Sequence, residues 1–159
     1  MDQAREQFFS SARGLQANMF AAPRTFVHGD FRLDNFFFGE VEAEHEIVVF
    51  DFQGPLLGKG IVDVALLLGQ STKKEVRRAH ERALVCRYAA GLRGHGIDYQ
   101  DETAWNDYLD AILYSWLYTG VVAGTLDASN PKSYAWMAQM VDRQSTASMD
   151  HDVFSRLTL

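Results

Sequence analysis

Three oxygen-bearing side chains lie along the stretch 25–51 at a spacing that suits chemistry on a phosphate. Asp30 ends a His-Gly-Asp tripeptide, Asn35 follows five positions later, and Asp51 ends the apolar run 47–50, which indicates a buried strand. A carboxylate beside a hydroxyl can orient it and accept its proton. Mg²⁺ takes oxygen ligands and keeps several waters. A base, an amide oxygen and a strand-end carboxylate in this order are what phosphoryl transfer from Mg-ATP requires.

Each of these residues alone also has a purely structural interpretation. An isolated Asp30 would bond its own backbone in a turn. Asn35 alone would open a strand, and Asp51 alone is equally a turn residue. Gly29 lets the backbone turn tightly before Asp30. The combination, with a predicted hairpin between the two aspartates, is far more specific than any single member.

The elements that must position these side chains can be predicted from periodicity and from turn residues. We expect a helix over 2 to about 20, an extended segment over 25–27, and hairpin strands over 35–38 and 46–50 joined by an exposed acidic turn at 40–45. After a loop marked by Gly54, Pro55, Gly58 and Gly60, we expect helices over 61–70, 73–92, 102–124 (capped near Thr103), from Pro131 onward, and over 148–156. The predicted class is α+β and mostly helical, with a small β-hairpin and about five to six helices.

Composition limits the classes of partner. The 159 residues suffice for one domain or one lobe, and the net charge of −6 without a basic stripe argues against nucleic acid and anionic membranes. The apolar runs are far shorter than the ~20 residues of a membrane span, and the first residues lack a signal-peptide pattern. Cys86 is the single cysteine. We therefore expect a cytoplasmic protein.

The segments HGDFRLDN (28–35) and VVFDFQ (48–53) resemble motifs of the aminoglycoside phosphotransferase and choline kinase-like superfamily, and most closely those of its ecdysteroid kinase-like branch. The resemblance implies a protein-kinase-like fold and a kinase that transfers the γ-phosphate of ATP, or of GTP, to a hydroxyl of a small molecule. It also implies a role for each matching residue. By resemblance, Asp30 would be the catalytic base, Asn35 and Asp51 the Mg²⁺ ligands, His28 and Gly29 the shapers of the loop, and Asp63 its support from behind.

The resemblance is strongest over 24–70 and extends to the helical remainder only in class. Upstream of His28 there is no glycine-rich loop and no strand lysine paired with a helix glutamate, and only 27 residues precede it. We therefore expect 1–159 to correspond to the C-terminal lobe, with its motifs in 25–63 and a helical subdomain over 64–159, and without the nucleotide-binding lobe.

Such a lobe is expected to be weak or inactive alone, because positioning and electrostatic clamping of the nucleotide come from both lobes. It should expose an apolar patch, to be covered by a second copy or by a chain that supplies the other lobe. Sterol, amino alcohol, sugar and antibiotic acceptors all remain open.

Two alternatives compete with the kinase interpretation. In a metal oxygenase, His28, Asp30 and a distant histidine would form a facial triad. That scheme leaves Asn35 and Asp51 without a role. The second alternative is a non-catalytic, kinase-like binding or dimerisation module.

Several other groups carry weaker signals. The aromatic set of the 102–124 segment is either core or the lining of an acceptor pocket, Arg32 would touch a phosphate or a carboxylate such as Asp34, and the basic run 73–78 suggests a solvated helix start. The histidines without consistent spacing are interpreted as surface residues. The aromatic set is Trp105, Tyr108, Tyr114, Trp116 and Tyr118, and the histidines are His45, His80, His95 and His151.

Overall fold

The computed structural model describes residues 2–40, 47–127 and 129–157. This part of the chain is mostly helical with two small antiparallel sheets, so the predicted α+β class is confirmed. The α-helices are α1 (Asp2–Met19), α2 (Ile61–Leu66), α3 (Lys74–Gly94), α4 (Asp101–Thr125) and α5 (Pro131–Asp150). The strands are β1 (Thr25–Val27), β2 (Phe36–Phe38), β3 (Ile47–Val49) and β4 (Leu56–Gly58). A π-helical turn, Leu67–Ser71, extends α2.

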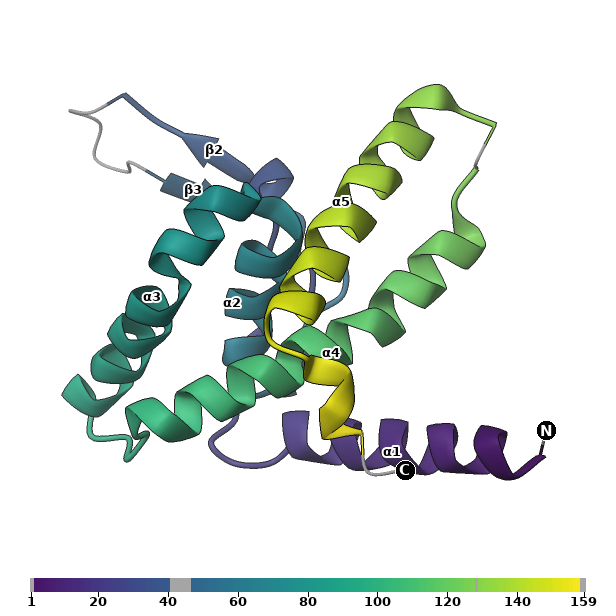
Figure 1. The fold of residues 1–159 in the computed structure, drawn as a ribbon. Coiled ribbons are helices and arrows are strands. Elements are labelled where there is room, and N and C mark those ends of the chain that lie inside the picture. The colour runs from purple at the N-terminus through teal and green to yellow at the C-terminus, as the bar shows by residue number, and fades with distance from the viewer. Residues whose placement is uncertain (1, 41–46, 128, 158–159) are drawn as a thin grey trace.

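Helix α4 is the centre of the lobe. It packs against α1, α2, α3 and α5, and α1 lies below it in Figure 1. The core forms where α2, α3 and α4 meet, around Ile61, Val85, Tyr108 and Ile112, all of which are almost fully buried. Burying an apolar side chain of this size stabilises the fold by about 1.5–3 kcal/mol. The short α2 is thereby held rigidly behind the His-Gly-Asp segment.

The predicted hairpin is present as β2 paired with β3, with Phe36 opposite Val49. A second pair was not predicted. Strand β4 lies in the loop marked by glycines and a proline, and it pairs antiparallel with β1, with Val27 opposite Leu56. Its run of three residues is too short for a periodicity to show. This pairing returns the chain to the start of the His-Gly-Asp segment.

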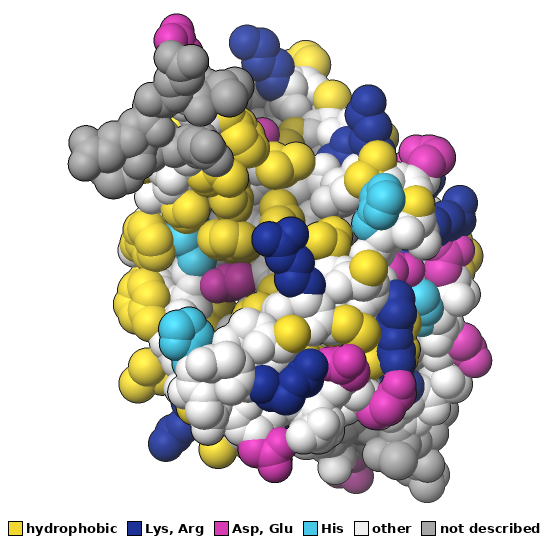
Figure 2. Space-filling model, turned by 90° about the vertical axis from the view of Figure 1, so that its left-hand side faces the viewer, with side chains coloured by type: hydrophobic (Ala, Val, Ile, Leu, Met, Phe, Trp, Pro, Cys, Tyr) yellow, Lys and Arg dark blue, Asp and Glu magenta, His cyan; other side chains and the backbone are white. Residues whose placement is uncertain are grey.

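Both sheets carry large exposed apolar side chains. Hydrophobic side chains gather on one side of the face shown in Figure 2. Each of the following is at least 45% exposed: Phe26 on β1, Leu57 on β4, and Phe37, Phe38, Ile47 and Val48 on the hairpin. An apolar surface of this kind fits the expected patch.

The predicted last helix is wrong. Helix α5 runs unbroken through Ser148 to Asp150, because no glycine or proline interrupts the segment that begins at Pro131. Asp152 then adopts a left-handed backbone (φ 45°), and only a 3-10 turn, Val153–Arg156, follows. Helix α4 matches the predicted span of 102–124 to within one residue at each end, although Gln100 rather than Thr103 is at its N-cap.

Two predictions lie on residues that the structure does not describe. The acidic turn predicted at 40–45 falls on 41–45 except for its first residue, and His45 is in the same segment. Glu40, which the structure does describe, is exposed. His80 and His95 are exposed, as predicted. Among the described residues, no helix is both long and apolar enough to cross a bilayer.

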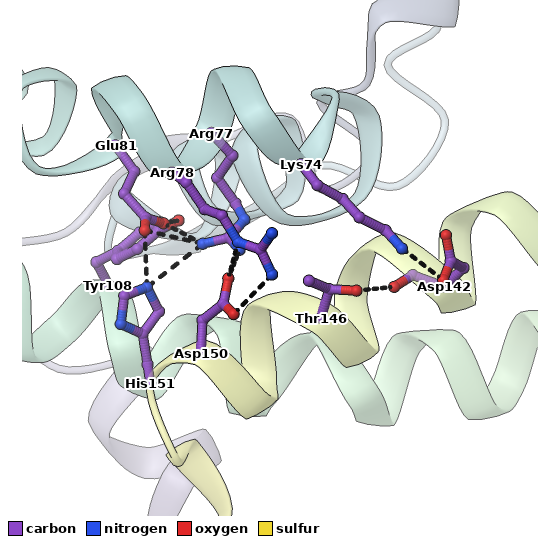
Figure 3. A network of polar contacts seen from close by, with 9 residues as sticks. All are labelled: Lys74, Arg77, Arg78, Glu81, Tyr108, Asp142, Thr146, Asp150 and His151. Carbon is purple, nitrogen blue, oxygen red and sulfur yellow. Dashed lines mark hydrogen bonds and ion pairs between the residues drawn. The ribbon is translucent and has the colours of Figure 1, made fainter.

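The basic run starts α3 and is mostly exposed, as predicted, but Arg77 within it is buried. Its guanidinium donates to both oxygens of Glu81, at 2.8 and 2.7 Å, and also to Asp150 (Figure 3). Glu81 also accepts from Tyr108 at 2.9 Å and lies 2.8 Å from Nε2 of His151. His151 is therefore a partly buried member of an α3–α5 network rather than a surface residue. Arg78, by contrast, is exposed.

Candidate active site

The carboxylate of Asp30 is the most heavily bonded group of the loop. Nε and Nη2 of Arg32 donate to its two oxygens at 2.5 and 2.9 Å. Nδ2 of Asn35 donates to its backbone oxygen at 2.8 Å and to its carboxylate at 3.1 Å. The Tyr118 hydroxyl of α4 donates from 3.1 Å. The structure thus brings Asp30 and Asn35 into direct contact, and it adds two partners that the motif alone did not identify.

The His-Gly-Asp backbone is fixed from behind by α2. The Asp63 carboxylate accepts from the backbone N–H groups of His28 and Gly29, at 2.8 and 3.0 Å. Burial raises the pKa of Asp63, and these two donors only partly offset that effect. Gly29 has φ +82°, and a Cβ there would lie 2.4 Å from the carbonyl oxygen of Gly54. Only glycine fits this position without moving the backbone.

Both ring nitrogens of His28 are engaged within the loop. Nδ1 accepts from the backbone N–H of Asp30 at 3.2 Å, and Nε2 lies 2.9 Å from the carbonyl oxygen of Phe50. This pattern assigns the proton to Nε2. The facial-triad alternative needs a free nitrogen on His28, so the geometry argues against it. Among the described residues, no three His, Cys, Asp or Glu side chains group closely enough to hold a metal.

The end of the hairpin connects Asn35 with Asp51. The N–H of Phe50 donates to the backbone oxygen of Asn35 at 3.1 Å, which ties the two strand ends together. Asp51 follows with a left-handed backbone (φ 66°) and is exposed. Its carboxylate accepts no hydrogen bond from the described residues. The amide oxygen of Asn35 has no donor among them either, so both oxygens are free for a ligand.

The pKa of Tyr118 is raised by its surroundings, including both aspartates. Burial, the charge of Asp30, its hydrogen bond to Asp30, and the charge of Asp51 together raise the pKa of Tyr118 to about 12. Asp30 contacts the phenol directly at 3.1 Å, whereas the charge of Asp51 is the smallest of these influences.

Arg32 lowers the pKa of the Asp30 carboxyl. Burial raises the pKa of Asp30, but the hydrogen bond and charge of Arg32, with smaller contributions from Asn35 and Tyr118, bring it below its ordinary value. Asp30 is therefore ionised at neutral pH. The guanidinium also stacks on Trp136 of α5, with Cζ 4.6 Å from the ring centroid.

The aromatic set of α4 divides into core and site residues. Tyr108 is fully buried and bonds Glu81, and Trp116 donates to Ser148, so both belong to the packing of the helices. Tyr118 alone reaches the loop. Neither Tyr118 nor Trp136 could be assigned from the motif, because each lies on a helix more than eighty residues after Asp30. Helical spacing placed Tyr118 in the aromatic set, but it did not distinguish Tyr118 from the other members of that set.

The lobe architecture and the His-Gly-Asp loop supported by a helix carboxylate define a kinase-like transferase class. Residues 1–98 match the ecdysteroid kinase-like family, and the chain belongs to that family. No curated protein and no solved structure matches the chain.

Proposed function

We propose that this protein is an ATP-dependent phosphotransferase lobe that acts on a hydroxyl of a small molecule. The observation that carries the proposal is the contact of Asn35 with Asp30, combined with the hydrogen bond from the Phe50 N–H, next to Asp51, to the backbone oxygen of Asn35. Asp30, Asn35 and Asp51 are the three oxygen-bearing residues of the motif. Family membership supports the same chemistry.

In this proposal Asp30 is the catalytic base. Its ionised carboxylate orients the acceptor hydroxyl toward the γ-phosphate and takes its proton as the new O–P bond forms and the bond to the nucleoside diphosphate leaving group breaks. His28 and Gly29 shape the loop, and Asp63 holds it through two backbone N–H groups. None of these three contacts the reacting atoms, so they are positioning residues.

The free oxygens of Asn35 and Asp51 fit a magnesium site. Mg²⁺ is held by few protein oxygens and keeps several waters, and one amide oxygen with one carboxylate is such a set. Bound Mg-ATP, or Mg-GTP, would supply the γ-phosphate and neutralise charge on the phosphates. The left-handed backbone of Asp51 carries its side chain at the exposed end of the hairpin, where a phosphate can approach.

The motifs in 25–63 and the helical subdomain in 64–159 together form one kinase C-lobe in this proposal. The 159 residues alone should bind Mg-ATP only weakly, because few groups of one lobe clamp the nucleotide. Calorimetry that gives micromolar affinity would contradict this. A chain that supplies nucleotide-binding groups, or a second copy, would complete the site.

The test is phosphate transfer from labelled ATP to a panel of small hydroxyl compounds, with the lobe in full-length or reconstituted form. Asp30→Asn and Asp51→Asn should each lower turnover by roughly a hundredfold or more while the melting temperature stays close to the parent's. Asp98→Asn, which changes an exposed aspartate that only accepts from Gln100, is the matched control. Retained turnover in Asp30→Asn would remove this residue from the base role.

A binding or dimerisation module is the second candidate, and the exposed apolar side chains of the sheets favour it. It predicts association without turnover. Sedimentation of the isolated lobe over a concentration series, beside the transfer assay, separates the two functions.

A further inference from the structure

A cavity of about 230 Å³ opens beside the Asp30 loop, on the side of α5. Arg32 and Asp34 line it from the loop, Gln70 and Ser71 from the π-helical turn, and Trp136 and Arg143 from α5. Its size is below the ~300–1,000 Å³ of pockets for drug-sized ligands, so it holds a small molecule or one end of a larger one. Because Arg32 both lines the cavity and contacts Asp30, the cavity borders the proposed base.

Arg143 brings an unneutralised positive charge to this cavity. Its Nη1 donates to the backbone oxygens of Ser71 and Gln70, at 2.8 and 3.3 Å, and it pairs with no carboxylate among the described residues. Those carbonyls end a helical segment and hold the guanidinium in place without cancelling its charge. A partly buried arginine whose remaining donors are unused is suited to an oxyanion.

A further donor of the lining also lacks a partner, because the indole N–H of Trp136 has no acceptor among the described residues. The amide of Gln70, by contrast, is already committed to Thr119 and Gln144, at 3.2 Å each. The unused donors are therefore those of Arg143 and Trp136, and donors are what an oxyanion needs.

The single acid of the lining does not neutralise the two arginines. Asp34 is 66% exposed, and its carboxylate is 3.5 Å from Nη1 of Arg32, farther than either oxygen of Asp30. Water screens so exposed a pair. Arg32 is paired with Asp30, so the uncompensated charge of the lining is that of Arg143. That charge, with the donors beside it, favours an anion and disfavours the cationic amines of an aminoglycoside or an amino alcohol.

We propose that this cavity binds the anionic group, a carboxylate or a phosphate, of the hydroxyl acceptor, and that the bound anion draws Arg32 away from Asp30. This inference rests on the proposed phosphotransferase function. Arg143 provides the fixed contact and Arg32 the mobile one.

When Arg32 moves from Asp30 to the bound anion, it keeps its paired hydrogen bonds and changes only its partner. A guanidinium binds two oxygens of a carboxylate or phosphate side by side, so it can leave the Asp30 carboxylate for the ligand's oxyanion without losing its paired hydrogen bonds. The Trp136 ring stacks on the cation and can accompany the shift. Asp30 is then free to accept the hydrogen bond of the acceptor hydroxyl. An acceptor with an anionic group thus makes the proposed base available by binding.

The experiment uses the whole 159-residue chain without nucleotide, with glycerate as the probe and its uncharged amide, glyceramide, as the matched control. The three indole N–H signals are followed by NMR, and Trp136→Phe identifies that of Trp136. Glycerate should shift the Trp136 signal in a saturable manner and glyceramide should not. Arg143→Gln should weaken glycerate binding about tenfold or more, because a charge-assisted contact is lost. Arg87→Gln, an exposed arginine of α3, should leave it unchanged.

Two further arms locate the anion site and test the move of Arg32. ATP added to the glycerate complex should not displace glycerate, and displacement would assign the cavity to nucleotide phosphate instead. Saturating glycerate should shift the Arg32 Nε–H signal in ¹⁵N NMR, because that group would leave the Asp30 carboxylate for the anion. Equal binding of glyceramide, or an unchanged Arg143→Gln affinity, would overturn the anion site. These readouts need no turnover, so a failed transfer assay with intact glycerate binding would count against the phosphotransferase alone.

Discussion

The guanidinium of Arg32 covers the carboxylate of Asp30, with Nε 2.5 Å from Oδ1 and Nη2 2.9 Å from Oδ2. The pair is only two residues apart, and its side chains are 13% and 8% exposed. A carboxylate held in this way is ionised but not available to a further hydroxyl. The Asp30 carboxylate is therefore occupied by Arg32, and the effect of Arg32 on the pKa of Asp30 can be measured.

Arg32→Ala should raise the pKa of Asp30 above its ordinary value. The substitution removes the largest lowering influence, the hydrogen bond and charge of the guanidinium, while the raising influence of burial remains. A ¹³C NMR titration of the Asp30 carboxyl measures the shift. Arg24→Ala, which alters an exposed arginine upstream of the loop, should leave the titration unchanged. A pKa of Asp30 that stays below its ordinary value in Arg32→Ala would show that Asn35 and Tyr118 suffice.

The motif stretch was the most predictable part of this protein. The order of base, hairpin and strand-end carboxylate depends on short-range spacing, and local turn chemistry fixes it. The side chains that reach the Asp30 loop from the helices were not predictable in the same way. Tyr118 and Trp136 reach the loop only through the packing of α4 and α5, and nothing in their own neighbourhoods marks them.

Within the basic run, the burial of Arg77 was not predicted, for a related reason. A charged cluster at a helix start is usually solvated, but Arg77 faces α5, where Asp150 and His151 can pair with its network. That environment is created by residues more than seventy positions away. Strand β4 was missed because strand pairing is long-range, so a run of three residues gains its partner only in the folded chain.

Gly29→Ala should destabilise the loop by at least about 2 kcal/mol. A left-handed backbone costs a non-glycine residue roughly 1–2 kcal/mol, and the added Cβ would also lie 2.4 Å from the carbonyl oxygen of Gly54. Gly96→Ala separates the two effects, because Gly96 has φ +81° with no atom near its Cβ position. Urea unfolding of both variants measures the difference. Equal losses would mean that the contact with Gly54 relaxes freely.

Arg77→Ala should lower the free energy of unfolding by about 3–5 kcal/mol, because it leaves the buried Glu81 carboxylate without its main cation. Arg78→Ala is a matched control, since Arg78 pairs with the same Asp150 but is 51% exposed. Because water screens that exposed pair, its loss should lower the free energy of unfolding by less than the loss of Arg77 does. Similar losses in the two variants would refute the distinction. Chemical denaturation at neutral pH measures both.

The same network should make the fold sensitive to acid through Asp150. Hydrogen bonds from Arg78 and then Arg77, together with their charges, lower the pKa of Asp150 to about 2 against a small opposing effect of burial. A carboxyl whose folded pKa is lowered contributes stability that is complete above its unfolded pKa of about 4 and is lost as the pH falls toward the folded value. The free energy of unfolding should therefore fall between about pH 4 and pH 2.

Asp150→Asn tests this assignment, because an amide cannot titrate. The variant should be less stable than the parent at neutral pH, and its stability should fall less steeply between about pH 4 and pH 2. Asp98→Asn should keep the parent's steep dependence, since Asp98 is exposed and accepts only from Gln100. Glu81, whose pKa is also lowered, contributes the part of the acid response that persists in Asp150→Asn. If the variant and the parent lose stability in parallel across that range, then Asp150 does not couple α5 to α3, and Arg77 is held by Glu81 alone.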